Sequence, residues 1–180
     1  IIMKAIELKT EYLENPIAID IKSPQLSWIA EGAVRQKAYQ MKACVNGKEV
    51  YDTGKVESAR MYHRYQGVLE SRNRVTWKVR LWDERDICGA WSEEAYFEMG
   101  LLHENDWKAK WINPECEHRK GDRQPASYLK KEFFAEKIGN ARLYITAHGV
   151  YDAYINGVKA GEFVLAPGTS QYDVRLQYQV

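Results

Sequence analysis

The densest group of acidic residues in this sequence comprises Asp83, Glu84, Asp86, Glu93 and Glu94. Two carboxyl groups can act as general acid and general base when they face one pocket and one of them stays protonated. Asp83 and Asp86, however, fall in an expected turn between two strands. Glu93 and Glu94 are adjacent, so on a strand they point to opposite faces. We interpret all five as solvated turn and edge charges and predict no shared pocket and no catalytic residue.

Histidine, serine and cysteine residues show no catalytic or metal-binding spacing. The four histidines, His63, His103, His118 and His148, form neither an HxH nor an HExxH pattern. His148 lies between two expected strands, and we interpret it as a structural residue. No serine lies in a GxSxG string, and no cysteine has a recognisable base partner. The sequence therefore predicts no metal site, no cofactor and no nucleophilic catalysis.

Aromatic side chains are the remaining signal for binding, because the chain contains 12 Tyr and 6 Trp. A pyranose presents a face of C–H groups that can lie flat on an indole or phenol ring beside fixed polar groups. The candidates for such a carbohydrate contact are Trp82, Trp107, Trp111 and Tyr151, with Tyr144 and Tyr154 in the same group of tyrosines. Packing of these rings against a neighbouring domain is the alternative, and we favour it.

The elements that would position these rings are β-strands, because helical periodicity is nearly absent. Val75, Trp77, Val79 and Leu81 alternate with Thr76, Lys78, Arg80 and Trp82. Such alternation predicts a strand with one face in a core, so we expect Trp77 and also Trp28 to be buried. Residues 39–45 alternate in the same way and lead into Asn46-Gly47, a dipeptide typical of type I′ hairpins.

Further strands are expected in both halves of the chain. In the first half they lie around residues 6–8, 26–29, 61–65 and 91–99. About seven short strands separated by turn signals indicate a β-sandwich. The pattern then lapses, and we place a domain boundary near residue 103. In the second half we expect strands over residues 107–112, 128–134, 141–147 and 150–156, a hairpin at Asn156-Gly157 and a mobile surface loop over residues 113–124.

Composition limits the possible partners. The chain has 180 residues, with 26 basic and 25 acidic side chains, and this balance argues against nucleic-acid binding. No apolar run is long enough for a membrane span, and we expect no membrane association. The three cysteines form no CxxC pair, which favours reduced thiols in the cytoplasm unless a signal peptide has been removed. Ile1-Ile2 precede Met3, so we expect the natural start to differ.

Four groups of residues, in order along the chain, resemble one protein family. They are residues 11–20 with 24–28, 39–41 and 52–56; residues 77–80 with 91–94; residues 107–112; and residues 141–157 with 165–168 and Tyr172. Together they resemble the amino-terminal region of bacterial α-L-rhamnosidases. The resemblance implies an all-β chain: a fibronectin type III or immunoglobulin-like β-sandwich over residues 1–103, then a truncated jelly-roll, galactose-binding-like domain over residues 104–180.

The same resemblance implies a function for the parent protein. Enzymes of that family remove terminal α-L-rhamnose from glycosides with inversion, and their acid and base carboxylates lie on a helical barrel that this chain lacks. We therefore expect a non-catalytic amino-terminal fragment that is inactive alone and whose partner is the catalytic domain, with rhamnose-containing glycosides as candidate ligands. Because the second segment lacks strand partners, self-association through exposed strand edges is also expected. A stand-alone carbohydrate-binding or adhesion module is the alternative.

Overall fold

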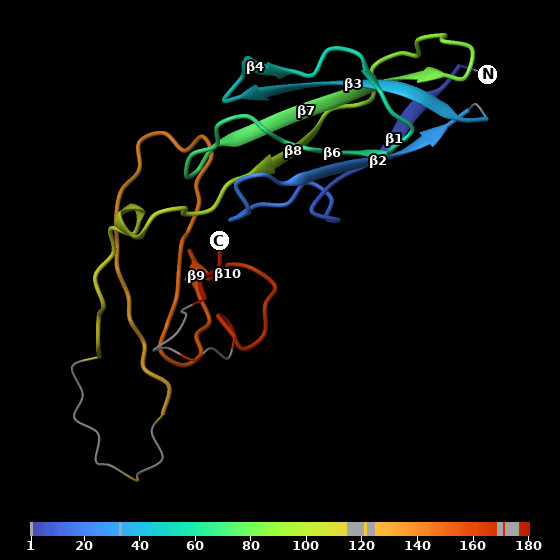
Figure 1. Ribbon diagram of the computed structural model, residues 1–180. Coiled ribbons are helices and arrows are strands. Elements are labelled where there is room, and N and C mark those ends of the chain that lie inside the picture. The colour runs from blue at the N-terminus through green and yellow to red at the C-terminus, as the bar shows by residue number, and fades with distance from the viewer. Residues whose placement is uncertain (1, 33, 115–120, 122–124, 169–170, 172–176) are drawn as a thin grey trace. The chain divides into compact units, whose positions relative to one another are not determined.

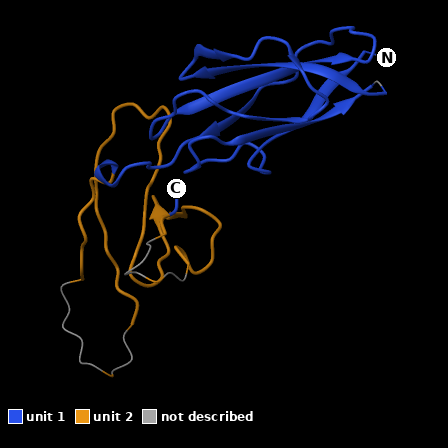
Figure 2. Ribbon diagram, viewed as in Figure 1, with its two compact units in different colours: residues 1–106, 179–180 blue, residues 107–178 orange. Residues whose placement is uncertain are grey.

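The computed structural model describes residues 2–32, 34–114, 121, 125–168, 171 and 177–180 (Figure 1). The chain divides into two compact units. Unit 1 contains Ile1–Asp106 with Gln179–Val180, and unit 2 contains Trp107–Tyr178 (Figure 2). The predicted loop over residues 113–124 falls largely outside the described residues, as do Cys116, His118 and Tyr172.

Unit 1 consists of two antiparallel β-sheets. Sheet 1 has the order β1-β2-β6, with β1 at Lys4–Thr10, β2 at Gln25–Glu31 and β6 at Tyr62–Arg64. Sheet 2 has the order β4-β3-β7-β8, and β5 also pairs with β3. Its strands are β3 (Gln36–Val45), β4 (Lys48–Asp52), β5 (Val56–Glu57), β7 (Arg74–Asp83) and β8 (Ala95–Glu98). The predicted β-sandwich is confirmed.

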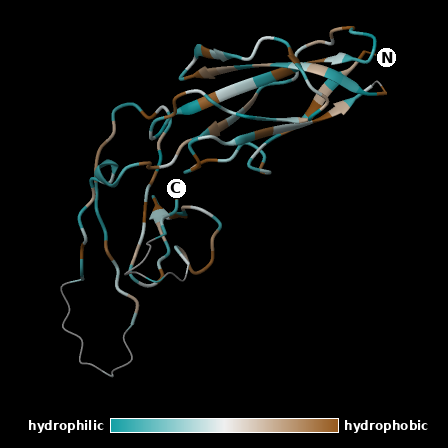
Figure 3. Ribbon diagram, viewed as in Figure 1, coloured by the Kyte–Doolittle hydropathy of each residue, from teal (hydrophilic) through white to brown (hydrophobic). Residues whose placement is uncertain are grey.

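The core of unit 1 lies between the two sheets, because each sheet turns its apolar residues inward. Leu26 and Trp28 come from sheet 1, and Met41 and Phe97 come from sheet 2. Along β7 every second residue from Val75 to Leu81 is buried, and Trp77 is 1% exposed. Alternating bands of hydropathy along the strands show the same period in Figure 3. The register predicted from the sequence is therefore correct, and the expected burial of Trp28 and Trp77 is confirmed.

The hairpin at Asn46-Gly47 joins β3 to β4 as predicted. Val45 pairs with Lys48 across it, and both turn residues have positive φ, 50° for Asn46 and 83° for Gly47. Asparagine and glycine tolerate this left-handed conformation better than other residues. The predicted strand over residues 91–99 is shorter, however. The Ser92 hydroxyl accepts the Val79 N–H and the Ser92 N–H donates to the Val79 carbonyl, but the regular strand β8 begins only at Ala95.

Unit 2 has little regular structure among its described residues. A hairpin joins β9 (Tyr154–Ile155) to β10 (Val158–Lys159) at the predicted Asn156-Gly157 turn, and Tyr151 forms an isolated bridge with Ala166. The strands predicted over residues 107–112, 128–134 and 141–147 are wrong, since none of these segments forms a described strand. A strand needs a neighbour for its amides, and the described structure gives these segments no strand partner.

The chain leaves unit 1 through a short 3-10 helix, η1, at Glu104–Asp106. The Ser71 hydroxyl donates to the Asp106 carboxylate, and that carboxylate also accepts the His103 N–H at 3.0 Å. These bonds fix η1 to the turn before β7, so η1 is part of unit 1. The domain boundary near residue 103 stays a prediction.

Candidate functional site

The four aromatic candidates lie in different units of the structure. Trp82 is at the end of β7 in unit 1, whereas Trp107, Trp111 and Tyr151 belong to unit 2. The surroundings of Trp82 follow from the register of sheet 2. Because core and outer residues alternate, the residues opposite the buried set of β7 share the outer face with their partners on β3 and β8. Direct pairs on this outer face are Gln40 with Arg80, Lys42 with Lys78, Ala38 with Trp82, and Thr76 with Tyr96.

Arg80 is the centre of this outer face. Its Nε and Nη2 both donate to Gln40 Oε1, at 2.9 and 2.7 Å. Its guanidinium carbon lies 5.1 Å from the ring centroid of Trp82 and 4.8 Å from that of Trp91. A guanidinium at these distances is attracted by the negative faces of the indole rings. Arg80 therefore holds two half-buried tryptophans against the sheet.

Lysine side chains also lie over these two indole rings. Lys55 Nζ is 5.3 Å from the Trp82 centroid, and Lys78 Nζ is 5.6 Å from the Trp91 centroid. Lys55 is held in place by Asp86, at 2.6 Å, and by Glu57. A sugar that stacked on Trp82 would have to share the ring with these cations. A carbohydrate contact at Trp82 stays a prediction. A sugar bound there would compete with the Lys55 and Arg80 side chains for the indole ring.

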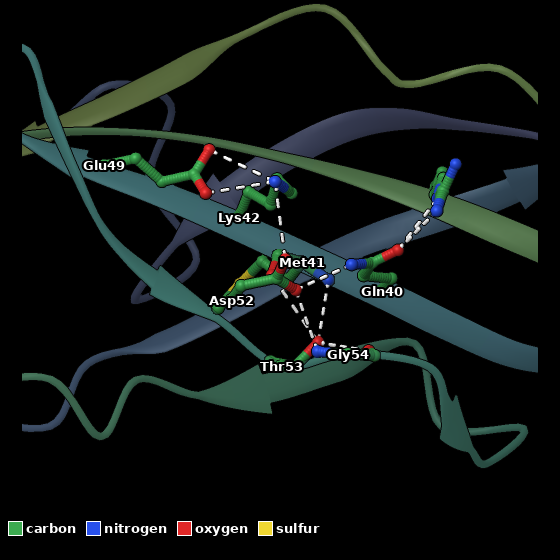
Figure 4. Close-up of polar contacts among 8 residues, drawn as sticks. Gln40, Met41, Lys42, Glu49, Asp52, Thr53 and Gly54 are labelled. Carbon is green, nitrogen blue, oxygen red and sulfur yellow. Dashed lines mark hydrogen bonds and ion pairs between the residues drawn. The ribbon is translucent and has the colours of Figure 1, made fainter.

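A polar network runs from Gln40, the partner of Arg80, to the edge of sheet 2 (Figure 4). Gln40 Nε2 donates to Asp52 Oδ1 at 2.6 Å, and the same oxygen accepts the Gly54 N–H at 2.8 Å. The hydrogen bond from Gln40 lowers the pKa of Asp52, with Gly54 and Lys42 acting in the same direction. Lys42 also contacts Glu49, at 3.0 Å, and this bond raises the pKa of Lys42. The network therefore favours the ionised forms of Asp52 and Lys42 and fixes β4 to β3.

Two of the acidic residues around residue 83, Asp83 and Asp86, are held in the ionised form. Asp83 is buried, and its Oδ1 accepts the backbone N–H groups of Arg85 and Ile87 at 3.0 and 2.8 Å. The Ile87 bond lowers the pKa of Asp83, and the Lys55 contact lowers the pKa of Asp86. A general acid needs a raised pKa, so neither group is suited to that role. The prediction of a turn charge is correct for Asp86, but Asp83 organises the turn from a buried position.

In unit 2 the structure brings together two residues that the sequence treats separately. The rings of Trp111 and His148 lie with centroids 4.3 Å apart at an angle of 45°. Trp111 is 60% exposed, so an indole surface remains open beside an imidazole. Trp107 contacts Tyr178 instead, with centroids 5.9 Å apart, and the Tyr151 N–H donates to the Ala166 carbonyl at 2.8 Å. Whether any of these three candidates contacts a carbohydrate stays a prediction.

Sequence reasoning missed Arg80, Gln40 and Trp91. The first two were detectable, because they occupy facing positions on strands whose alternation is clear. Trp91 gave no such signal, since it precedes β8 outside the regular ladder. Among the described residues, no group of three or more His, Cys, Asp or Glu side chains is placed to hold a metal ion. The helices that the structure describes also include none with the length and apolarity of a membrane span.

Two facing antiparallel sheets with short strands define an immunoglobulin-like β domain. Residues 5–103 match the family described as "Rha78A-like, N-terminal immunoglobulin domain". Residues 136–180 match the "Alpha-L-rhamnosidase N-terminal domain". The chain therefore belongs to the family of Rha78A-like N-terminal immunoglobulin domains, and the predicted resemblance and the all-β fold are confirmed.

Individual relatives give the same result. An α-L-rhamnosidase of Formosa agariphila is 36% identical to this chain in an alignment 186 positions long, which covers 93% of this chain and 20% of that enzyme. The structure of the α-L-rhamnosidase from Dictyoglumus thermophilum covers 98% of this chain with a TM-score of 0.83 and 34% identity. The Streptomyces avermitilis enzyme, solved with L-rhamnose, covers 62% with a TM-score of 0.58 and 32% identity. This chain spans about a fifth of the Formosa relative's length.

Proposed function

We propose that this chain is the non-catalytic amino-terminal part of an α-L-rhamnosidase, an enzyme that removes terminal α-L-rhamnose from glycosides. One observation carries the proposal: almost the whole chain matches such enzymes but only 20% of the Formosa relative and 23% of the Dictyoglumus structure. The carboxylates of the acidic cluster support it, since hydrogen bonds or ion pairs hold Asp83 and Asp86 ionised. The parent enzyme's acid and base would then lie outside these residues.

The role we assign to this part is docking to the catalytic domain. Several apolar side chains of unit 2 are almost fully exposed, among them Tyr128 at 97%, Phe133 at 80% and Phe134 at 87%. Exposed aromatic surface of this kind is unfavourable in water and is typical of an interface. The remainder of the parent enzyme would cover it.

The test is a comparison of this chain with the reading frame that contains it. We expect the frame to continue well beyond Val180 into helix-rich sequence and its full product to hydrolyse an aryl α-L-rhamnoside. The 180-residue chain alone should show no rate above buffer. A frame that stops directly after Val180 contradicts the proposal. So does turnover by the isolated chain that survives repurification and disappears in the E93Q or E94Q variant.

In isolation, the uncovered apolar surface of unit 2 should make this chain self-associate. Sedimentation velocity at increasing concentration should show dimers or larger species, and F134S should reduce them. V34S is the matched control, because Val34 is 92% exposed but belongs to unit 1. A strict monomer at high concentration would remove self-association from the proposal. It would leave the reading-frame test unaffected.

A stand-alone carbohydrate-binding or adhesion module is the second candidate, favoured by the open Trp111 ring beside His148. Calorimetric titration of the chain with L-rhamnose distinguishes the two candidates. Saturable heat that W111A removes and Y128A retains would favour the binding module, since Tyr128 is a fully exposed aromatic residue of the same unit. Absence of binding in the wild-type chain would favour the enzyme fragment.

We also propose that the parent protein is cytoplasmic. Cys44 and Cys88, the cysteines in the described part of the chain, are free thiols. Fractionation of the source cells should place the protein with cytoplasmic markers. Recovery with periplasmic or secreted markers would contradict this location.

A further inference from the structure

His63 occupies a position in unit 1 that neither the motifs nor the candidate site explains. It lies on β6, the edge strand of sheet 1, and pairs directly with Leu26 on β2. Directly paired residues of an antiparallel ladder point to the same face. Because Leu26 is completely buried, His63 also points into the space between the two sheets, where its side chain is half-buried.

Both ring nitrogens of His63 are bound by tyrosines of the opposite sheet. The Tyr39 hydroxyl on β3 lies 2.9 Å from Nδ1, and the Tyr51 hydroxyl on β4 lies 2.8 Å from Nε2. The ring centroids of both tyrosines are 5.8 Å from that of the imidazole. One imidazole thus ties edge strand β6 of sheet 1 to two strands of sheet 2.

The arrangement of protons in this cluster follows from its donors and acceptors. A neutral imidazole has one N–H donor and one acceptor nitrogen. Burial raises the pKa of Tyr51, whereas a backbone hydrogen bond from Gln66 to the Tyr51 oxygen acts in the opposite direction and leaves the Tyr51 hydrogen free to donate. Tyr51 then donates to Nε2 of His63, so Nδ1 carries the proton and donates to Tyr39. The network assigns this tautomer.

We propose that Tyr39, Tyr51 and His63 form a pH-sensitive latch, which closes the β4 and β6 side of the sandwich while His63 is neutral and opens when His63 is protonated. An imidazolium carries N–H donors on both nitrogens. The new Nε2–H would meet the hydrogen of the Tyr51 hydroxyl, which must turn away and lose its acceptor. Protonation therefore reverses the hydrogen bond between Tyr51 and His63 and leaves the Tyr51 hydrogen without an acceptor in the cluster.

Among the described residues, no carboxylate contributes to the pKa shift of His63, whose cause is burial. The titratable groups around the latch are the phenols of Tyr39 on β3, Tyr51 on β4, Tyr62 on β6 and Tyr65 after β6, and the charge of Arg60 acts on Tyr39. Tyr65 is buried against Tyr51, and its hydroxyl is among the buried groups without a hydrogen-bond partner in the described structure. Burial lowers the pKa of His63 below its ordinary value of 6.5.

The direction of the pH effect follows from this shift. The open or unfolded chain binds a proton at the ordinary pKa, whereas the closed latch resists it. The latch therefore contributes fully above pH 6.5, and its contribution declines as the pH falls below 6.5 toward the lower pKa of the folded state. Carboxylates with lowered pKa values change the stability of the chain only below about pH 4. Their effect and that of His63 therefore occur in separate pH ranges.

Nuclear magnetic resonance on the full 180-residue chain tests the latch directly. We expect the imidazole nitrogen shifts of His63 to report the Nδ1–H tautomer and a titration midpoint below 6.5. Y51F removes the donor to Nε2 and should raise that midpoint. Y62F is the matched control on the same strand, because Tyr62 is exposed and faces outward, and it should leave the midpoint unchanged. A wild-type midpoint at or above 6.5, or equal midpoints in Y51F and Y62F, would overturn the proposal.

Amide exchange supplies a second readout that needs no variant to fold. In the wild-type chain the opening equilibrium of β4 and β6 should rise below pH 6.5, by at most about tenfold per pH unit, because one proton is taken up on opening. The central strands β3 and β7 should respond less. An opening equilibrium of β4 and β6 that is the same at pH 7.0 and pH 5.5 would contradict the latch. If H63Q folds, it should remove the pH dependence, and its persistence would also contradict the latch.

Discussion

The two units of this chain have similar apolar patterns but very different packing. In unit 1, Tyr65, Trp77 and Phe97 are at most 1% exposed. In unit 2, Phe133 and Phe134 are 80% and 87% exposed, although both lie in a segment whose pattern predicted a strand. The difference teaches that apolar periodicity specifies which face a strand would bury. It does not provide the neighbour that the strand needs.

Hydrogen bonding differs between the units in the same way. β3 and β7 of unit 1 are paired from Gln36 with Asp83 to Val45 with Val75. The ladder between β9 and β10 in unit 2 contains two residue pairs, Val158 with Ile155 and Lys159 with Tyr154. We infer that unit 1 is stable by itself and that unit 2 depends on a surface supplied from outside. The variants below test this contrast.

Truncation of the central core residue should have the largest effect. W77A is expected to lower the free energy of unfolding of unit 1 by about 3–5 kcal/mol, the usual range for a large buried aromatic residue. Urea unfolding followed by amide resonances of unit 1 measures it. W111A, at an exposed ring of unit 2, is the control and should change the same quantity by less than about 0.5 kcal/mol. A loss below about 1 kcal/mol for W77A would mean that β7 has the opposite register.

Removal of a buried turn carboxylate should have a smaller and pH-dependent effect. The folded-state pKa of Asp83 is lowered, first by the Ile87 hydrogen bond, so its contribution to stability is present above about pH 4 and is lost as the pH falls further. D83N should therefore destabilise unit 1 at pH 7 and reduce the stability change between pH 5 and pH 3. E93Q, at an exposed side chain, should retain the wild-type change. Identical pH profiles for D83N and the wild type would refute this role.

Loss of the Arg80 contacts on the outer face should cost still less. R80A removes the guanidinium from Trp82 and Trp91 and is expected to lower the unfolding free energy of unit 1 by about 1 kcal/mol. K78A removes a contact with Trp91 at 5.6 Å and an exposed ion pair with Glu94 at 3.9 Å, and it should cost less than about 0.5 kcal/mol. If R80A lowers the unfolding free energy as much as W77A does, the outer face of sheet 2 contributes as much to stability as the core between the sheets.

Truncation of an exposed aromatic residue in unit 2 should have the smallest effect on stability. F134S is expected to change the unfolding free energy of unit 1 by less than about 0.5 kcal/mol, because the side chain is 87% exposed. The same urea experiment measures it. A loss above about 2 kcal/mol would show that residue 134 is packed in solution and would break the contrast between the units.

The sequence predicts unit 1 well because its signals are local and mutually consistent. The alternation of apolar and polar residues correctly predicted which face of β7 is buried, including Trp77. The Asn46-Gly47 dipeptide correctly predicted the turn between β3 and β4. In unit 2 the prediction of a turn at Asn156-Gly157 was correct for the same reason, because the residues that form a hairpin are neighbours in the sequence. The strands over residues 107–112, 128–134 and 141–147 were wrong because pairing is a property of neighbours, which a local pattern does not encode.

The candidate site was only partly predictable. The outward position of Trp82 followed from period two, but the cations that cover its ring come from Lys55 and Arg80 on different segments. The contact of Trp111 with His148 joins residues far apart in the sequence, and spacing motifs carry no information about such contacts. The same is true of the cluster formed by Tyr39, Tyr51 and His63, whose members lie on three strands of two sheets.

Residue-resolved hydrogen exchange on the 180-residue chain tests the central contrast most directly. Amides of β3 and β7 should exchange only through global unfolding of unit 1. The described residues of unit 2 should exchange on the order of 100-fold faster or more, because few of their amides are paired and local opening there costs little. Uniformly slow exchange across both units would contradict the account and would mean that unit 2 is complete without any further surface.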